Sequence, residues 1–240
     1  MEKKRDISIF CDFDGTIATK DIGNEIVIAC GEFQPWNDLL KAGKMDIKDY
    51  WRKVLSTMRL ETSPEEFFRE FVKTIDIDAN FGMFVAFCRE NDIKLSIISD
   101  GFKNYILPFL EYNGIDGVKV YANEIEYTPS GLIPHYYGAS DGCECMCASC
   151  KRNTILSTTP PDDIIAYIGD GFSDLCGAEH SDIVFAKQVL SHYCNEKKIP
   201  HYNFKNFFDV TRIFRNIIGK NDFRVRHQAF LARKHAFECE

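Results

Sequence analysis

Three short apolar segments, each followed directly by polar side chains, constrain the fold of this chain most strongly. They cover residues 6–11, 93–98 and 164–168, and stretches with helical spacing of apolar residues lie between them. Such an alternation of strands and helices indicates an α/β fold with a mostly parallel sheet that is flanked by helices. Because ligands bind at the carboxyl ends of parallel strands, the polar residues after the three segments are expected to lie close together.

These polar residues are rich in carboxylates. The set consists of Asp12, Asp14, Ser99, Asp100, Gly101, Asp170 and Asp174, and Lys151 begins a helix between the second and third strands. Asp12 and Asp14 lie two residues apart, so both side chains point the same way where strand geometry persists. Two anions this close need a shared proton or a cation, and Mg²⁺ prefers such carboxylate oxygens. A single Asp after a strand is usually a helix cap or a turn residue, but that explanation accounts poorly for several strand ends in one chain.

In their order along the chain, these residues resemble the four motifs of the haloacid dehalogenase superfamily of phosphatases. The motifs are Asp12-Phe13-Asp14-Gly15-Thr16, Ser99-Asp100-Gly101, Lys151 and Gly169-Asp170-Gly171-Phe172-Ser173-Asp174. The resemblance implies a Rossmann-like phosphatase core domain, formed by residues 1–20 and 78–218, with a small helical cap domain inserted over residues 21–77.

The same resemblance implies the catalytic roles. Asp12 would be the nucleophile that forms an aspartyl-phosphate, and Asp14 would be the general acid and base. The residues expected to bind the phosphoryl group are Ser99, Asp100, Gly101 and Lys151. Dehalogenases and transport ATPases of this superfamily lack the second Asp of the first motif. Because Asp14 is present here, hydrolysis of a phosphomonoester is the expected reaction.

A magnesium ion is the cofactor that the resemblance implies. Its ligands would be Asp12, the main-chain carbonyl of Asp14, and Asp170. Asp174 would lie close behind, bound through a water or against Lys151.

Substrate specificity would lie in the cap, because a lid reads the part of the substrate beyond the phosphate. The candidate residues are Asp21, Glu25, Trp36, Trp51 and Arg52. Phosphoserine phosphatases hold the serine with an acid after the first motif and an Arg of the cap. Asp21 suits the first role, but the Arg position falls on Val54, and Arg52 is out of register. Phosphoserine is therefore an alternative rather than the favoured substrate.

Four cysteines directly precede Lys151, at positions Cys143, Cys145, Cys147 and Cys150. A cysteine-rich segment at this place resembles two families of the small-cap branch. One dephosphorylates 2-hydroxy-3-keto-5-methylthiopentenyl-1-phosphate in methionine salvage, and the other dephosphorylates phosphoethanolamine or phosphocholine. The four thiols suit a Zn²⁺ site, a redox-sensitive pair, or a thiol-rich loop near the substrate. The six other cysteines are expected to be small, reduced, buried apolar residues.

The C-terminal segment 219–240 extends beyond the core and is expected to form a helix. Its aromatic and aliphatic residues would make one apolar face that docks on the core or contacts a second copy, so the chain is a monomer or a homodimer. These residues are Phe223, Phe230, Leu231 and Phe237.

Charge and hydropathy exclude several other classes. The net charge is −7 and the sequence pI is about 5.4, which argues against a nucleic-acid binder. No apolar run approaches about 18 residues, and the N-terminus lacks the features of a signal peptide. The chain is therefore expected to be cytoplasmic, to have no membrane partner, and to bind a small phosphorylated metabolite.

Two other functions are compatible with the sequence. A metal- or redox-responsive binding module that kept the fold would explain the cysteines, but it predicts the loss of a catalytic carboxylate, and none is lost. A phosphotransferase would use the same residues and pass the phosphoryl group to an alcohol other than water.

Overall fold

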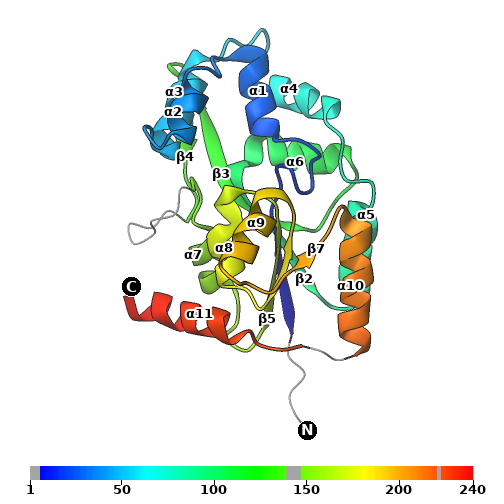
Figure 1. The fold of residues 1–240 in the computed structure, drawn as a ribbon. Coiled ribbons are helices and arrows are strands. Elements are labelled where there is room, and N and C mark those ends of the chain that lie inside the picture. Colours follow the sequence, from blue (N-terminus) through cyan, green and yellow to red (C-terminus); the bar gives the residue numbers. More distant parts are fainter. Residues whose placement is uncertain (1–5, 139–146, 221–222, 240) are drawn as a thin grey trace.

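A computed structural model describes residues 6–138, 147–220 and 223–239 of the chain (Figure 1). Its sheet has seven strands: β1 (Ile7–Cys11), β2 (Lys94–Phe102), β3 (Lys119–Thr128), β4 (Gly131–His135), β5 (Ile164–Gly169), β6 (Ile183–Ala186) and β7 (Tyr202–Asn203). Its α-helices are α1 (Ile22–Cys30), α2 (Trp36–Lys41), α3 (Ile47–Thr57), α4 (Pro64–Phe71), α5 (Phe81–Glu90), α6 (Lys103–Tyr112), α7 (Lys151–Thr158), α8 (Leu175–Glu179), α9 (Gln188–Glu196), α10 (Phe207–Gly219) and α11 (His227–Cys239). Two short 3-10 helices, η1 (Val72–Thr74) and η2 (Phe172–Asp174), complete the described part.

The strand order explains where the site forms. It is β4-β3-β2-β1-β5-β6-β7, and all neighbours are parallel except the hairpin of β3 and β4. The chain builds one half of the sheet outward from β1 and then returns to place β5 on the other side of β1. The carboxyl ends of β1 and β5 therefore meet at a topological switch point, where open α/β sheets bind ligands. The expected α/β class and mostly parallel sheet are confirmed.

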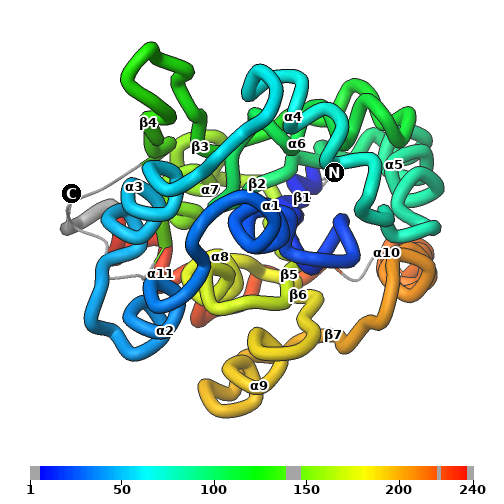
Figure 2. The backbone as a smooth tube through the Cα atoms, turned by 90° about the horizontal axis from the view of Figure 1, so that it is seen from above, coloured from blue at the N-terminus to red at the C-terminus, as the bar shows by residue number. Residues whose placement is uncertain are grey.

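Helices cover both faces of the sheet, because successive residues of a strand point to opposite sides. In β5, Ile164, Ala166 and Ile168 pack in one core with residues of α5, α6 and α10. Ile165 and Tyr167 pack in the other core with residues of α7, α8 and α9. The view along the sheet shows these two helical layers on either side of the central strands (Figure 2). A strand that is buried on both faces has a continuous run of apolar residues in its sequence, and β5 has such a run.

The segment between β1 and α5 forms helices α1 to α4, which lie beyond the carboxyl ends of the strands (Figure 1). Helix α4 begins where its sequence predicts: Ser63 is the N-cap, its hydroxyl accepts a hydrogen bond from Glu66 N, and Pro64 is the first residue. The two ends of the segment lie side by side, because Thr19 N donates to Asp76 O at 2.9 Å. The division into a core and a cap over residues 21–77 stays a prediction.

The second apolar strand is longer than the sequence indicated. β2 continues to Phe102, and its pairing with β3 shifts register between Ile98 and Phe102. Ser99, Asp100 and Gly101 therefore lie in an irregular strand end rather than in a loop after the strand. Such irregularities bend a strand and reorient its side chains, and they are frequent beside functional sites.

The C-terminal helix forms, but the expected apolar face is wrong for two of its residues. Phe230 and Leu231 of α11 are each about half exposed, at 50% and 49%. Ala229 and Ala236 are the buried residues of this helix. Phe223, which precedes it, is partly buried against the main core, and the side chain of Phe237 lies outside the described part.

Two arginines, not aromatic residues, hold α11 on the core. Arg226 donates to the main-chain oxygens of Ala178 and Glu179, both at 2.7 Å. Arg233 donates to His180 O at 2.7 Å and pairs with the buried carboxylate of Asp182 at 3.0 Å. The last carbonyls of a helix lack partners within it, so the end of α8 needs such donors. Small alanines let the two helices approach closely enough for these bonds.

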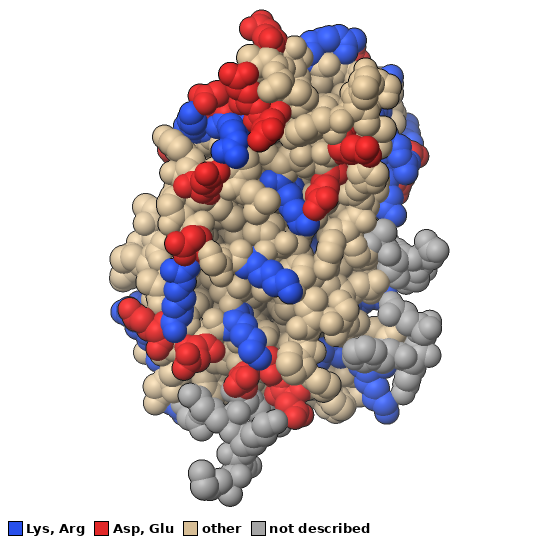
Figure 3. All heavy atoms as spheres, turned by 180° about the vertical axis from the view of Figure 1, so that it is seen from behind, with Lys and Arg blue, Asp and Glu red and all other residues tan. Residues whose placement is uncertain are grey.

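The face opposite to that of Figure 1 carries both signs of charge, interspersed over its surface (Figure 3). In the described ranges, no helix is both long enough and apolar enough to cross a membrane.

Candidate active site

A buried ion-pair cluster lies at the switch point. Lys151, the first residue of α7, is completely buried, and its Nζ donates to Asp12 Oδ1 at 2.7 Å and to Asp174 Oδ1 at 2.6 Å. Burial alone would lower the pKa of Lys151, but the charges of Asp12 and Asp174 outweigh it and raise that pKa well above its usual value. The lysine is therefore a permanent cation beside Asp12, where an incoming phosphoryl group would meet it.

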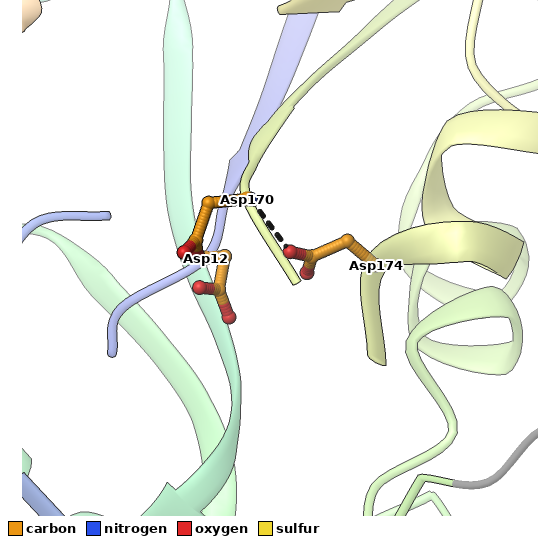
Figure 4. Close-up of side chains that lie close together, drawn as sticks. All are labelled: Asp12, Asp170 and Asp174. Atoms are coloured by element: carbon orange, nitrogen blue, oxygen red, sulfur yellow. Dashed lines mark hydrogen bonds between the residues drawn. The ribbon is translucent and has the colours of Figure 1, made fainter. Parts of the chain in front are cut away.

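Three carboxylates come together at this point, from the ends of the neighbouring strands β1 and β5 and from η2. Each of Asp12, Asp170 and Asp174 has an oxygen that lies within 4.8 Å of the others (Figure 4). Burial raises the pKa of Asp12 well above its ordinary value, and repulsion from Asp174 raises it further. Burial and the same repulsion also raise the pKa of Asp170. Three acids beside one lysine leave excess negative charge. Their carboxylate oxygens are the type of ligand that a hard divalent cation prefers.

Asp174 differs from the other two acids because donors already saturate its carboxylate. Its Oδ1 accepts from Lys151 and from the Tyr167 hydroxyl, and its Oδ2 accepts from the main-chain nitrogens of Asp170 and Gly171. Two carboxylate oxygens offer about four lone-pair sites, and here four donors use them. This geometry suits a residue that holds Lys151 in place better than one that binds a metal ion directly.

Asp14 lies on the cap side of the site and is oriented by two donors. Ile22 N donates to its Oδ1 at 2.8 Å, and the Tyr105 hydroxyl donates to its Oδ2 at 3.1 Å. Burial raises the pKa of Asp14 well above its usual value, and the charge of Asp21 raises it further. A carboxyl with a raised pKa keeps its proton to a higher pH than an ordinary carboxyl does, which suits a general acid. The Asp14 carboxylate is not part of the three-acid group, so a metal would reach Asp14 only through its main chain.

The close approach of α6 to this acid requires glycine at position 101. A Cβ on Gly101 would lie 1.8 Å from the Tyr105 hydroxyl oxygen and 2.8 Å from Asp14 Oδ2. Ser99 is buried beside it, and its Oγ accepts from Gly101 N at 2.9 Å. The hydroxyl hydrogen of Ser99 is thus left to donate, which suits a phosphoryl oxygen.

The carboxylate of Asp100, a residue expected to bind substrate, is engaged by main-chain groups. Its two carboxylate oxygens accept from Ala148 N at 3.2 Å and from Ser149 N at 3.1 Å. These bonds fasten the segment just before Lys151 to the end of β2. Burial raises the pKa of Asp100 to about 6, against the lowering effect of the Lys151 charge. The structure therefore presents Asp100 as a support for Lys151.

The raised pKa of Asp100 predicts a pH-dependent difference in stability. A group whose folded-state pKa lies above its unfolded-state value contributes stability at low pH and loses it as the pH rises through the folded value. For Asp100 that window runs from about pH 4 to about pH 6. We expect the wild type to lose stability relative to Asp100→Asn across this window and no further above it. Urea unfolding of both proteins in EDTA at pH 4, 5, 6 and 7 checks this, and a constant difference would contradict it.

The residues expected to determine substrate specificity do not all lie close to the active site. Asp21 caps α1 and accepts from Asn24 N at 2.8 Å, close to Asp14. Trp51 is buried in α3 and packs edge-on against Phe102, with ring centroids 4.9 Å apart. Arg52 is exposed and pairs with Asp49 at 2.6 Å. Thus Asp21 lies close to Asp14 and Trp51 lies against the end of β2, whereas Arg52 contacts Asp49 and the ring of Tyr136.

Val54, where a phosphoserine phosphatase would place its arginine, is fully buried in the apolar core. The remaining candidates, Glu25 and Trp36, contact Lys20 and Lys53 respectively at the surface.

The cysteine segment lies mostly outside the described residues, which exclude Cys143 and Cys145. Cys147 is partly exposed, and Cys150 is buried and caps α7 by accepting from Asn153 N at 3.5 Å. The zinc and redox hypotheses for this cluster stay predictions.

The scattered cysteines mostly meet expectation. Four are reduced thiols: Cys11, Cys30, Cys88 and Cys194. Cys176 of α8 is disulfide-bonded instead, so for this residue the expectation of a reduced thiol is wrong.

Three residues of the site were absent from the sequence-based prediction: Tyr105, Tyr167 and Asn123. Asn123 is fully buried and donates to Asp100 O at 2.8 Å, which fixes the end of β2. No local pattern marks these residues, because each acts through a partner on another element of the fold.

The class of protein follows from this fold and site together with a family comparison. The family model of haloacid dehalogenase-like hydrolases matches residues 9–179, which include all four motifs. The chain belongs to this family and is a phosphatase of the haloacid dehalogenase type. The alternative of a non-catalytic binding module is left without support.

Among individual proteins, the chain is similar to curated phosphatases of one name. A 2-hydroxy-3-keto-5-methylthiopentenyl-1-phosphate phosphatase of Geobacillus kaustophilus is 32% identical over 213 residues, which cover 86% of this chain and 94% of that protein. The protein of that name from Brevibacillus brevis is 31% identical over 224 residues, which cover 90% and 98%. A substrate-bound phosphoserine phosphatase structure shares the fold with a TM-score of 0.62 at 17% identity, over 88% of this chain and 99% of that one.

Proposed function

We propose that this protein is a Mg²⁺-dependent phosphomonoesterase that hydrolyses 2-hydroxy-3-keto-5-methylthiopentenyl-1-phosphate or a close analogue through an aspartyl-phosphate on Asp12. The main support for this chemistry is the position of Asp12, which is buried at the switch point. The Lys151 ammonium donates to its Oδ1, and Asp170 lies beside it. The substrate rests on the relatives of that name, which align over nearly their whole length.

In the first step, a carboxylate oxygen of Asp12 attacks phosphorus, and the bond from phosphorus to the substrate oxygen breaks. Asp14 gives its proton to the departing alcohol. In the second step, Asp14 takes a proton from a water, whose oxygen attacks the phosphorus and releases Asp12 and inorganic phosphate. Lys151 and Ser99 stabilise the charge on the phosphoryl oxygens in both steps.

The residues that would hold Mg²⁺ are Asp12, Asp170 and the main-chain carbonyl of Asp14. When bound, the ion supplies positive charge to the carboxylates and to the phosphoryl oxygens. Thr16 donates to Asp170 Oδ1 at 2.9 Å and so orients this acid.

The surroundings of Asp14 favour a leaving group without a carboxylate. Asp21 places a negative charge at the cap side of the site, and Arg52 is engaged by Asp49. A free carboxylate, as in phosphoserine, would be repelled by this charge. The same acid, with the Trp51 ring nearby, supports phosphocholine or phosphoethanolamine as the second candidate, because an aromatic face and an acid bind ammonium groups.

A phosphate-release assay tests this function. We expect Mg²⁺-dependent release that EDTA abolishes, with the highest kcat/KM for the methylthiopentenyl phosphate, followed by phosphocholine and phosphoethanolamine, and at least about tenfold less for phosphoserine. Equal rates on all four esters, or a preference for phosphoserine, would contradict the substrate. Assays with added methanol report a phosphotransferase directly, because methyl phosphate would then form.

A further inference from the structure

Tyr50 on α3 has a buried hydroxyl that the phosphatase chemistry does not use. The residue is 1% exposed, and its hydroxyl has no hydrogen-bond partner in the described ranges 6–138, 147–220 and 223–239. Buried polar groups nearly always have partners, so an exception points to strain or to a ligand. A tyrosine kept at this position instead of phenylalanine therefore calls for a functional reason.

Aromatic packing connects Tyr50 to the catalytic acid. The Tyr50 ring packs edge-on against Trp51, with centroids 5.4 Å apart. The tip of the Trp51 ring lies against Gly23, where a Cβ would be 2.8 Å from Trp51 Cη2 and 3.2 Å from the Tyr105 hydroxyl. Since Tyr105 donates to Asp14, this row of side chains ends at the group that protonates the leaving alcohol.

The charge of the Asp21 carboxylate acts on both the Tyr50 hydroxyl and Asp14. A Cβ on Gly23 would also lie 3.4 Å from Asp21 Oδ1, so this carboxylate borders the same spot as Trp51 and Tyr105. Burial raises the pKa of Tyr50, and the negative charge of Asp21 raises it further, to about 12. The same charge also raises the pKa of Asp14. The Asp21 carboxylate accepts from the main-chain and side-chain nitrogens of Asn24 and from Gly23 N, and these three donors leave one of about four lone-pair sites for another donor.

We propose that Tyr50 is a specificity-determining residue, whose hydroxyl donates a hydrogen bond to an oxygen of the leaving alcohol close to the phosphate ester. Asp21 would accept from a hydroxyl or enol at the same position. This inference rests on the proposed function and extends it, because it names the substrate feature that the cap recognises. The class of substrate is a phosphate ester with a carbonyl, hydroxyl or enol oxygen on the carbons next to the ester carbon.

A donor that is buried without a partner discriminates strongly. Its lost hydration is restored only by a substrate that offers an acceptor, whereas an analogue without that oxygen leaves the hydroxyl unsatisfied. The neighbouring negative charge of Asp21 disfavours a carboxylate there, which separates this recognition from that of an amino-acid phosphate.

The test compares two small esters that differ in these oxygens. Dihydroxyacetone phosphate carries oxygens on both carbons beyond the ester carbon, and n-propyl phosphate carries none. We expect the wild type to prefer the former in kcat/KM, and Tyr50→Phe to reduce that preference by roughly ten- to hundredfold. The melting temperature of Tyr50→Phe without substrate should not fall, because the hydroxyl makes no hydrogen bond to any residue that the structure describes.

Tyr136→Phe is the matched control. The Tyr136 hydroxyl donates to Lys48 O at 2.7 Å on the same helix α3, so its removal should lower the melting temperature and leave the substrate preference unchanged. A preference that survives in Tyr50→Phe, or a wild type without any preference, would overturn the proposal. If the methylthiopentenyl phosphate is a poor substrate but the preference falls in Tyr50→Phe, the substrate assignment fails and the role of Tyr50 stands.

Discussion

Replacing Asp12 with Asn should reduce Mg²⁺-dependent phosphate release by about 10³-fold or more and, at neutral pH in EDTA, raise the melting temperature. The activity falls because a neutral amide oxygen is a poor nucleophile toward phosphorus. Stability rises because burial and repulsion from Asp174 already disfavour the charged form of Asp12. Substituting Asn removes this repulsion and keeps the shape of the side chain. Steady-state phosphate release and thermal unfolding of the same sample measure both effects.

Asp163→Asn is the control for this variant. Asp163 is also buried and also pairs with a lysine, Lys94, at 3.1 Å, but it lies just before β5 at the opposite end of the sheet. It accepts a hydrogen bond from Ser8 at 2.8 Å as well. We expect Asp163→Asn to lower stability and to retain activity. Residual activity of Asp12→Asn within tenfold of the wild type would refute the nucleophile.

Replacing Lys151 with Met should remove both activity and much of the stability. Removing one partner of a buried ion pair leaves uncompensated charge and typically costs about 3–5 kcal/mol of unfolding free energy. Here the remaining charges are those of Asp12 and Asp174, each within 2.7 Å of the lost ammonium. Phosphate release should fall by about 10²-fold or more, because the phosphoryl oxygens lose their positive charge. Urea unfolding and phosphate release provide the two measurements.

The double variant Lys151→Met with Asp174→Asn separates the two losses. The second substitution removes one of the two carboxylate charges that Lys151→Met leaves uncompensated, so part of the lost unfolding free energy should return. Activity should not return with it, since no cation replaces Lys151. If the double variant is no more stable than Lys151→Met, then repulsion between Asp12 and Asp174 is not what the lysine offsets.

The main features of the sheet and the positions of the motifs could be predicted from the sequence, because both depend on local patterns. A strand buried on both faces needs a nearly continuous apolar run; residues 164–169 have one, and the run of residues 7–11 is interrupted by Ser8. Polar residues directly after such runs must then share one edge of the sheet. For the same reason, the capping residue Ser63 and the following Pro64 predict the start of α4.

Contacts between distant segments could not be read in this way. The orientation of Asp100 depends on the main-chain nitrogens of Ala148 and Ser149, 48 and 49 residues away. The helix α11 shows the same limit, since its arginines bind carbonyls at the end of α8 while its larger apolar residues stay exposed. An apolar pattern predicts which residues favour burial, but the partner surface decides which of them are buried.

The sequence by itself determined the reaction class, because the ordered motifs that contain Asp12, Asp14, Lys151 and Asp170 resemble those of haloacid dehalogenase-type phosphatases. Only the tertiary structure decided how these groups are tuned and what surrounds them. Long-range packing places Tyr105 on Asp14, saturates Asp174 with four donors, and leaves the Tyr50 hydroxyl without a partner among the residues that the structure describes. Burial and charge in three dimensions set pKa values and specificity, and neither quantity has a local signature in the sequence.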